Sequence, residues 1–476
     1  MRTRASVLAV VGVLGLWGCK VGPDYVRPPP AEPPPASFKE AGNWKVAQPQ
    51  DALRRDAWWK LFGQPELDPL IAQLDASNQS LKSAEAQYRQ SRAAVGVARA
   101  GAFPTVTANL GATRAHHLGP SSSVASAAAA SRGDSTTYSL PVDLTWELDL
   151  WGRVARLVEA SEGGAQASAA DLESARLSAQ AALVQDVLLV QALDTGVQLL
   201  RAAERDYEKT VEVTRNRYEQ GVAARSDLLQ VQSQLEVTRA QAIDLGVQRA
   251  QVEHAVAVLL GKNASSFSLP PRTLTAEPPL VPAVLPSELL ERRPDVAAAE
   301  RRMAAANAQI GVAHAAWFPR ITIGASGGFL SSSLGSWLTW PSLFWSVGPA
   351  LAQTLFEGGL RSAQEEQVRA GYDATVASYR QTALVAFQEV EDNLATLRIL
   401  EEEAQVQDRA LQAARQATEI VSNQYRAGTV GYLDVLVSET STLSAERVAL
   451  DIRSRRWAAT VLLVKAIGGG WSRPEP

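Results

Sequence analysis

The chain has 476 residues but only one cysteine, Cys19, and four histidines. One cysteine leaves no partner for an internal disulfide. The histidines do not show the spacing of a metal site with carboxylates or with Cys19; they are His116, His117, His254 and His314. A strongly basic surface is also lacking, because the net charge is −4, so nucleic-acid binding is not indicated.

A phosphate-binding loop is missing as well. Gly261 and Lys262 resemble the end of such a loop, but Val256 stands where the first glycine is needed. The pair also ends a helical pattern instead of following a strand. The sequence therefore predicts that the protein is not an enzyme and binds neither a metal nor a cofactor.

Proline is absent from two long stretches, residues 152–220 and 359–427. Each could form one helix of about 100 Å at a rise of 1.5 Å per residue. Each ends at a glycine, Gly221 or Gly428, where a left-handed residue is expected to terminate the helix. A second helical pattern follows each glycine, so the sequence predicts two antiparallel helical hairpins with their turns near these residues.

The chain repeats itself. Residues 79–104 return as 294–319, and residues 218–261 return as 425–468. Internal repeats of this kind favour stacking or ring closure over a single catalytic pocket. The predicted organisation is repeat 1 at 67–268 and repeat 2 at 286–468, joined by a Pro-rich linker at 269–285 and followed by a C-terminal tail at 469–476.

Each repeat carries a β-hairpin, at about 103–149 and 318–356. From Tyr138 to Leu148 apolar residues alternate with polar ones, a pattern typical of a transmembrane β-strand with aromatic ends. One such strand fits a soluble sandwich equally well, but its return in the second copy favours the membrane. In the first hairpin, we expect Gly133 and Asp134 in a turn and the adjacent histidines in an external loop.

Four strands cannot close a barrel alone, because open strand edges in hydrocarbon leave backbone groups unpaired. Known barrels have at least about eight strands. Two copies would supply about eight strands and three copies about twelve. The count permits a dimer, whereas a conducting pore favours a trimer.

The N-terminus reads as a secretory signal at residues 1–18, with an apolar stretch too short to span a bilayer. The stretch ends at Gly18-Cys19, which resembles a lipobox although Trp17 is unusual there, and Cys19 is the predicted lipidation site. Lys20 in place of an aspartate favours sorting to the outer membrane. A lipidated Pro-rich tether at 19–37 and an equatorial segment at 38–66 follow.

Several motifs in this order resemble the outer membrane factors, the TolC-like exit ducts, and specifically their NodT-type lipoprotein branch. The motifs are Cys19 with Gly22-Pro-Asp-Tyr25, Trp58-Trp-Lys-Leu-Phe62, Trp146-Glu-Leu-Asp-Leu-Trp-Gly-Arg153, Glu291-Arg-Arg-Pro-Asp295, Leu355-Phe356 with Gly358-Gly359, Tyr425 with Gly428, and Ala466-Ile-Gly-Gly-Gly-Trp471. The resemblance covers essentially the whole mature chain.

This resemblance implies a mainly α-helical protein with a transmembrane β part. Three copies would form a twelve-stranded β-barrel in the outer membrane, with four strands from each chain, and a long periplasmic α-helical barrel. The homotrimer would be the exit duct of an efflux system, joined through a periplasmic adaptor to an inner-membrane pump of the RND type. The exported molecules are not identified by the sequence.

The resemblance also implies where the functional residues lie. Leu433 occupies the position of an apolar constriction at the periplasmic tip. Val437 stands where relatives often have a carboxylate, so an acidic gate would have to use Asp434. Asp227 and Asp434 are expected either to cap helices or to face the pore. The tip also includes Tyr218, Tyr425, Gly221 and Gly428, and the expected residues of the barrel lumen are Asp143, Glu147 and Asp149.

A lipid-anchored periplasmic adaptor or scaffold is the alternative, since it would also have a lipidated start and helical hairpins. Such a protein should carry its hairpin once, between soluble β-domains. The chain instead carries two hairpins, each preceded by paired apolar strands, and this favours the duct.

Overall fold

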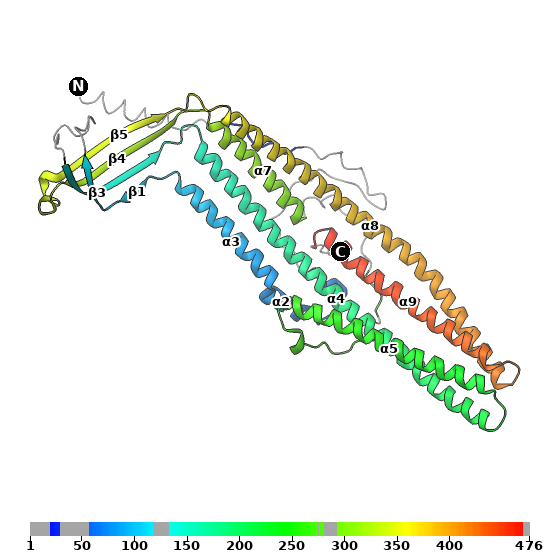
Figure 1. The fold of residues 1–476 in the computed structure, drawn as a ribbon. Helices are drawn as coiled ribbons and strands as arrows, with labels where there is room; N and C mark the ends of the chain where they lie inside the picture. The colour runs from blue at the N-terminus through cyan, green and yellow to red at the C-terminus, as the bar shows by residue number, and fades with distance from the viewer. Residues whose placement is uncertain (1–19, 29–56, 118–132, 275, 280–292, 470–476) are drawn as a thin grey trace. The chain divides into compact units, whose positions relative to one another are not determined.

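The computed structural model describes residues 20–28, 57–117, 133–274, 276–279 and 293–469 (Figure 1). It divides into two compact units. Unit 1 comprises Met1–Pro28, Tyr88–Ala167 and Ala299–Tyr379, and unit 2 comprises Pro29–Gln87, Ser168–Ala298 and Arg380–Pro476. The predicted signal peptide and Cys19 lie outside the described residues, as does most of the tether.

The long helices form where proline is absent, as predicted. Helices α4 and α8 have 67 residues each, and helices α5 and α9 have 35 residues each. The helical bounds are Trp58–Phe62 (η1), Leu67–Ser77 (α2), Gln79–Ala100 (α3), Arg153–Glu219 (α4), Arg225–Leu259 (α5), Ala264–Ser266 (η3), Pro294–Ala315 (α7), Leu360–Arg426 (α8) and Tyr432–Ala466 (α9). The equal lengths confirm the internal repeat.

Both long helices end at the predicted glycines. Gly221 and Gly428 have φ values of 73° and 74°, a backbone conformation that residues with a side chain adopt only rarely. Of the two roles expected for Asp227 and Asp434, helix capping is wrong, because Ala224 and Gly431 hold the capping positions; the pore-facing role stays a prediction. Each aspartate lies three residues later, in the first helical turn, where a negative charge still favours the helix dipole.

Unit 1 contains a sheet of antiparallel strands in the order β1-β3-β4-β5. The strands are Thr105–Ala108 (β1), Gly111–His117 (β2), Gly133–Glu147 (β3), Arg320–Ser331 (β4) and Leu343–Ala352 (β5). Strands β1 and β2 pair with successive parts of β3, so they form one interrupted strand. The sheet therefore has the four predicted strands, and within the described residues both of its edges are unpaired.

Three details of the strand prediction were wrong. The histidine pair lies at the end of β2, because Asp134 and Gly133 pair with it across the sheet. For the same reason Gly133 and Asp134 begin β3 instead of forming a turn. The fourth strand ends at Ala352, so Leu355 and Phe356 follow it.

The largest apolar core lies in unit 2. The rings of Trp58, Phe62 and Trp457 are in contact, with centroids 5.9 Å apart for the first pair and 5.8 Å for the second. They pack with leucines and valines of α2, α4 and α5. Among the described helices, only α4 has an apolar stretch long enough to cross a membrane, and more than half of that stretch is buried. This burial is typical of a core helix.

Candidate functional site

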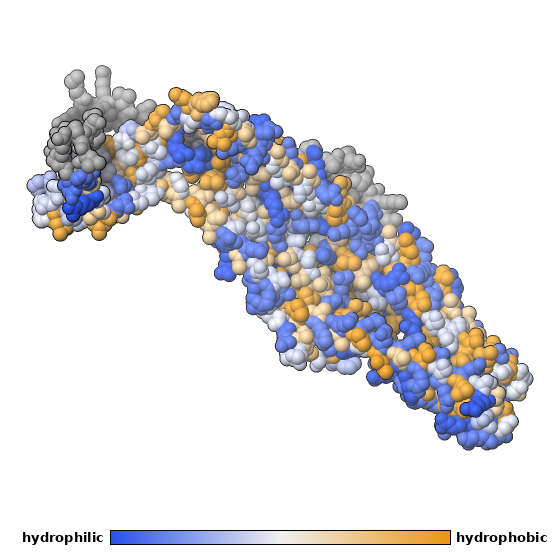
Figure 2. All heavy atoms as spheres, viewed as in Figure 1, coloured by the Kyte–Doolittle hydropathy of each residue, from blue (hydrophilic) through white to orange (hydrophobic). Residues whose placement is uncertain are grey.

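The strand region of unit 1 exposes large apolar side chains. On β5 the side chains of Trp345, Val347 and Leu351 are mostly exposed, and those of Leu355 and Phe356 that follow are almost fully exposed. Figure 2 shows apolar residues at the surface of this region. An exposed apolar band on a sheet with two open edges is what a barrel wall in contact with lipid requires.

The three acidic residues expected in the barrel lumen have different roles in the structure. Asp143 accepts a hydrogen bond from Ser326 Oγ at 2.6 Å on the neighbouring strand. Glu147 accepts two from the guanidinium of Arg153, at 2.8 and 2.9 Å. Asp143 and Glu147 both lie on β3. Both carboxylates have hydrogen-bond partners within unit 1.

Asp149 does not lie on a strand, contrary to prediction. Its carboxylate accepts hydrogen bonds from the backbone N–H groups of Val154 and Ala155, at 2.9 and 2.8 Å. These are unsatisfied donors of the first turn of α4, which a carboxylate stabilises. Asp149 is therefore a helix-terminal group, because β3 already ends at Glu147.

The described part of the tether, residues 20–28, belongs to unit 1 and packs there against α4 and α7. The Val21 amide donates to the carbonyl of Trp151 at 3.2 Å. Arg156, which is fully buried, donates to the carbonyls of Val21 and Gly22 at 3.2 and 3.1 Å. Asn307 donates to the Pro23 carbonyl at 3.1 Å. The segment is therefore fixed through its backbone, immediately after the predicted lipidation site.

At the turn of the second hairpin, α9 begins with apolar residues on its exposed side. Leu433 and Val437 are both more than half exposed, and they lie one helical turn apart on the same face of α9. Asp434 between them is also exposed. Tyr218, at the other turn, is partly exposed as well. Leu433, the predicted constriction residue, and its neighbours Asp434 and Val437 are thus available to contact further copies of the chain.

The opposite face of α9 is buried in a tip cluster that consists of Tyr207, Val211, Val231, Leu235, Tyr432 and Val435. The cluster joins α4, α5 and α9. Tyr425 packs edge-on against the Tyr432 ring, with centroids 5.6 Å apart. The Arg217 guanidinium lies 4.7 Å from the Tyr425 ring centre, a cation–π contact. Tyr425 therefore helps to join the two helical turns within one chain.

Glu439 was missed by the sequence reasoning. One of its carboxylate oxygens is buried without a hydrogen-bond partner. Burial, together with the negative charge of Asp206, raises the pKa of Glu439 to about 7. The same burial raises the pKa of Tyr432. The signal was available, because Tyr432, Val435 and Glu439 share one face of α9 by helical spacing.

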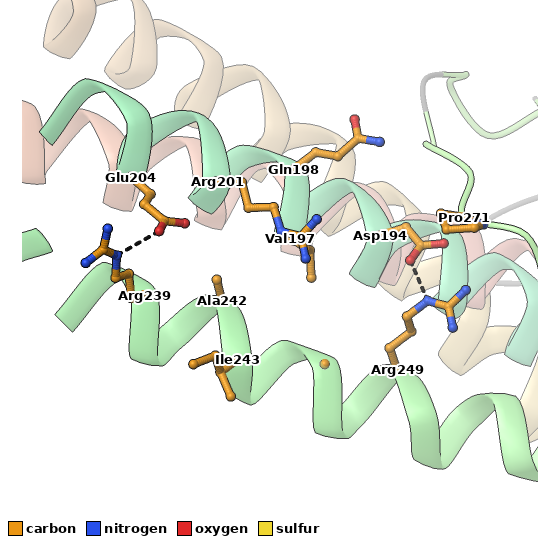
Figure 3. A pocket seen from close by; sticks show the side chains of 11 residues that line it. Asp194, Val197, Gln198, Arg201, Glu204, Arg239, Ala242, Ile243, Arg249 and Pro271 are labelled. Carbon is orange, nitrogen blue, oxygen red and sulfur yellow. Dashed lines mark hydrogen bonds and ion pairs between the residues drawn. The ribbon is translucent and has the colours of Figure 1, made fainter. Parts of the chain in front are cut away.

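A groove of about 520 Å³ lies between α4 and α5 in unit 2. Figure 3 shows that ion pairs close its two ends, Arg249 with Asp194 at 2.6 Å and Arg239 with Glu204 at 2.8 Å. Arg201 extends into it from α4 and forms no hydrogen bond or ion pair with any described residue. The lining offers no nucleophile with a neighbouring base.

The described ranges contain no group of three or more histidine, cysteine, aspartate or glutamate side chains that could hold a metal ion. Unit 1 contains an apolar sheet with open edges, and the chain also contains two long helical hairpins. Elements of these kinds are suited to the wall of a channel.

Comparison with known proteins gives concordant results. The family model described as outer membrane efflux protein matches residues 70–262 and 285–469. The toluene efflux pump outer membrane protein TtgC of Pseudomonas putida is 31% identical over 476 residues, covering 98% of this chain and 96% of that protein. Outer membrane protein OprJ of Pseudomonas aeruginosa is 31% identical over 472 residues, with coverages of 98% and 96%.

The fold resembles that of solved channels. The outer-membrane channel OprN matches with a TM-score of 0.85 at 30% identity, over 95% of this chain and 100% of that chain. The outer membrane protein VceC of Vibrio cholerae matches with a TM-score of 0.80 at 26% identity, over 88% and 100%.

Proposed function

Because the chain belongs to the outer membrane efflux protein family, it is an outer membrane channel subunit of an efflux system, and we propose that it acts as the passive exit duct of a tripartite assembly. The duct is a homotrimer, contacted at its helical turns by a periplasmic adaptor. An inner-membrane pump of the RND type supplies the energy. The cargo consists of small organic molecules, as the name of the toluene efflux relative suggests.

The observation that carries this proposal is the sheet of four strands with two open edges. Unpaired backbone groups in hydrocarbon cost several kcal/mol each, so the edge of β5 needs a partner such as the first strand of another copy. Three copies give twelve strands, enough for a barrel that encloses a pore. The alternative function, a periplasmic adaptor, does not require an apolar sheet with open edges that is completed by further copies.

Leu433 and Val437 form the closed gate in this proposal. In a three-fold ring their exposed side chains would face one another, and an apolar constriction stops conduction by excluding water. Asp434 lies beside this constriction and supplies the acidic group that Val437 lacks. The gate opens by movement of the helical turns when the adaptor binds.

Lipidation of Cys19 completes the proposed anchoring. The Val21 backbone is bonded to the carbonyl of Trp151, four residues after β3 ends. Cys19 precedes Val21 by two residues, so an acyl chain on it would start close to the end of a transmembrane strand. The fixed segment therefore suits a lipid anchor in the same membrane.

The decisive experiment combines fractionation with transport. Deletion of the gene should raise the accumulation of a fluorescent efflux substrate in energised cells, and the wild-type gene should restore export. The protein should sediment with outer membranes and migrate as a trimer on gels until it is heated. A purified mature chain that stays monomeric and soluble without detergent would contradict the proposal.

The gate is tested separately with Leu433→Cys. Oxidation should link copies through this position and stop export while trimers persist, and reduction should restore export. Cys19 is the only other cysteine in the chain, so the wild type treated with the same oxidant is the control. Normal export by the linked trimer would exclude Leu433 from the gate.

A further inference from the structure

A pocket of about 640 Å³ lies in unit 1, where the strands join the helices. Strand β3 leads into α4 there, α7 leads into β4, and β5 leads into α8 (Figure 1). All six elements contribute residues to the lining. A volume of this size accommodates a small organic molecule, so the chemistry of the lining decides what the pocket can bind.

Charged side chains of the pocket lie on the polar face of the sheet. Glu147 on β3 is paired with Thr322 on β4, and Arg320 lies two positions before Thr322, so all three share one face. Ile321 points to the opposite face, where Leu351 is its partner across the strands. That opposite face is apolar and contacts lipid in the proposed barrel, so Glu147 and Arg320 face the lumen.

Three arginines and three carboxylates line this pocket, namely Arg153, Arg320, Arg361, Glu147, Asp149 and Glu357. Both oxygens of Asp149 are occupied by backbone N–H groups of α4. Glu357 forms an ion pair with Arg361 at 3.0 Å. Glu147 accepts two hydrogen bonds from Arg153. Each carboxylate is therefore engaged by a group other than Arg320.

Arg320 is left with an unneutralised charge. Its side chain is 62% exposed, and its one ion pair with a described residue joins it to Glu147 at 3.8 Å. Its guanidinium donates no hydrogen bond to any described residue. Arg153 and Arg320 thus share one carboxylate, which leaves one positive charge in excess. A guanidinium with free N–H groups is suited to two parallel hydrogen bonds with an incoming carboxylate.

An aromatic wall lies beside this cation in the same pocket. The Trp151 ring stacks on Phe318, with ring centroids 4.9 Å apart and an angle of 23° between the planes. The indole N–H of Trp151 donates to the Pro319 carbonyl at 2.8 Å, which fixes the orientation of the ring. Both rings are half-buried. The lining therefore combines a fixed apolar surface with one available guanidinium, a combination typical of sites for small organic ligands.

We propose that the pocket binds small aromatic acids, with the ligand carboxylate on Arg320 and the ligand ring against Trp151 and Phe318. This inference rests on the proposed exit duct and adds a class of anionic cargo to it. Glu147 competes with the ligand for the arginines, so the ligand is held weakly and can leave again. Weak binding is what a conduit requires, because a molecule that passes through it must also be released.

The test measures binding of 2-naphthoate to the purified trimer in a neutral detergent, by equilibrium dialysis at low salt. Arg320→Gln should weaken binding by about tenfold, the scale of one charge-assisted hydrogen bond. Arg99→Gln is the matched control, because Arg99 is also 62% exposed and pairs with Glu162, and neither residue lines the pocket. The control should bind 2-naphthoate as the wild type does.

A second variant separates loss of a binding group from structural damage. Glu147→Gln removes the competing carboxylate and should strengthen 2-naphthoate binding by about threefold, the scale of a partly exposed ion pair. Structural damage would weaken binding in both pocket variants, whereas the proposal requires opposite signs. The neutral amide 2-naphthamide should bind more weakly than 2-naphthoate to the wild type and should not distinguish Arg320→Gln from Arg99→Gln.

The outcomes separate this site from the proposed function. Equal binding of 2-naphthoate by Arg320→Gln and Arg99→Gln, while unheated gels show trimers, would overturn the site although the duct stands. Displacement of 2-naphthoate by added phosphatidylglycerol would identify a lipid headgroup as the occupant and would overturn the assignment to cargo. If the wild type forms no trimer at all, the proposed exit duct fails as well.

Discussion

The Arg156 Nη2 atom lies 2.9 Å from the Asp24 Oδ1 atom, although the two residues are 132 positions apart. The Arg156 side chain is 1% exposed and that of Asp24 is 89% exposed. A buried guanidinium must be paired and hydrogen-bonded to offset its desolvation, and here the Glu159 carboxylate and two backbone carbonyls of the tether are its further partners. Arg156 thus binds residues 20–28 to α4 within unit 1.

Replacement of Arg156 should release this segment. In Arg156→Ala the carbonyls of Val21 and Gly22 lose their donor, and a loss of about 1–3 kcal/mol is expected for such buried groups. The measurement is limited proteolysis of the tether together with the thermal midpoint of the detergent-solubilised protein. Arg176→Ala is the control, because Arg176 is half-buried and pairs with side chains alone. Equal protease resistance in both variants would contradict the assigned role.

Gly22 should tolerate no side chain. Its φ is +93°, and a Cβ would lie 2.6 Å from the Cα of Gly311, so Gly22→Ala forces the tether away from α7. We expect faster proteolysis of the tether and a destabilisation of about 1–3 kcal/mol. Gly164→Ala is the matched control, since nothing lies within 4 Å of that Cβ and alanine favours a helix. A Gly22→Ala protein as resistant as this control would refute the close approach.

Asp149 should contribute to stability through the first turn of α4. Asp149→Ala removes the acceptor of two backbone N–H groups and should cost about 0.5–2 kcal/mol. Asp149→Asn keeps one acceptor oxygen and should retain most of the stability. Thermal unfolding followed by circular dichroism measures both. An unchanged midpoint in the alanine variant would show that the turn does not depend on this carboxylate.

Glu439 should make the stability of the helical region depend on pH. Its pKa is raised from 4.5 to about 7, so below pH 4.5 the carboxyl is protonated in both the folded and the unfolded state. As the pH rises toward 7 only the unfolded chain releases the proton, and the resulting destabilisation is complete above pH 7. The tyrosines Tyr207 and Tyr432 face this group, together with Asp206, and no described cation pairs with it.

Glu439→Gln should therefore gain stability at pH 8 and change little at pH 4.5. The gain is at most about 3.5 kcal/mol, from a shift of about 2.5 pKa units at about 1.4 kcal/mol per unit. Thermal midpoints measured from pH 4.5 to 8 provide the test. The control is Glu446→Gln on the same helix, which removes an ion pair with Arg415 and should keep the pH profile of the wild type. If the thermal midpoint of Glu439→Gln changed with pH in the same way as that of the wild type, this carboxyl would be excluded as the titrating group.

Much of the fold could be predicted from the periodicity of apolar residues and from the positions of proline and glycine, which interrupt helices. The absence of proline predicted the long helices, and Gly221 and Gly428 predicted where they end. Alternation from Tyr138 onward predicted β3, since the side chains of a strand point to opposite faces in turn. These features are local, so a single sequence suffices to identify them.

The candidate site was predicted less completely. Leu433 and the tip tyrosines were placed at the turns, where the structure has them. Asp149 was assigned to a strand because the alternating pattern continues past Glu147, although the unsatisfied donors of α4 recruit its carboxylate. Arg156 was missed because its role depends on groups that are distant in the chain. Glu439 shares a face of α9 with Tyr432 and Val435, but its burial depends on α4, which is distant in the chain.

The sequence by itself determined the element types, the repeat and the strand count, because these follow from spacing and from backbone restrictions of a few neighbouring residues. Only the tertiary structure decided which charges are buried, which carboxylate ends a helix and which apolar faces remain uncovered. Those properties depend on desolvation and packing between segments more than one hundred residues apart, as between Asp24 and Arg156, and no local pattern encodes them.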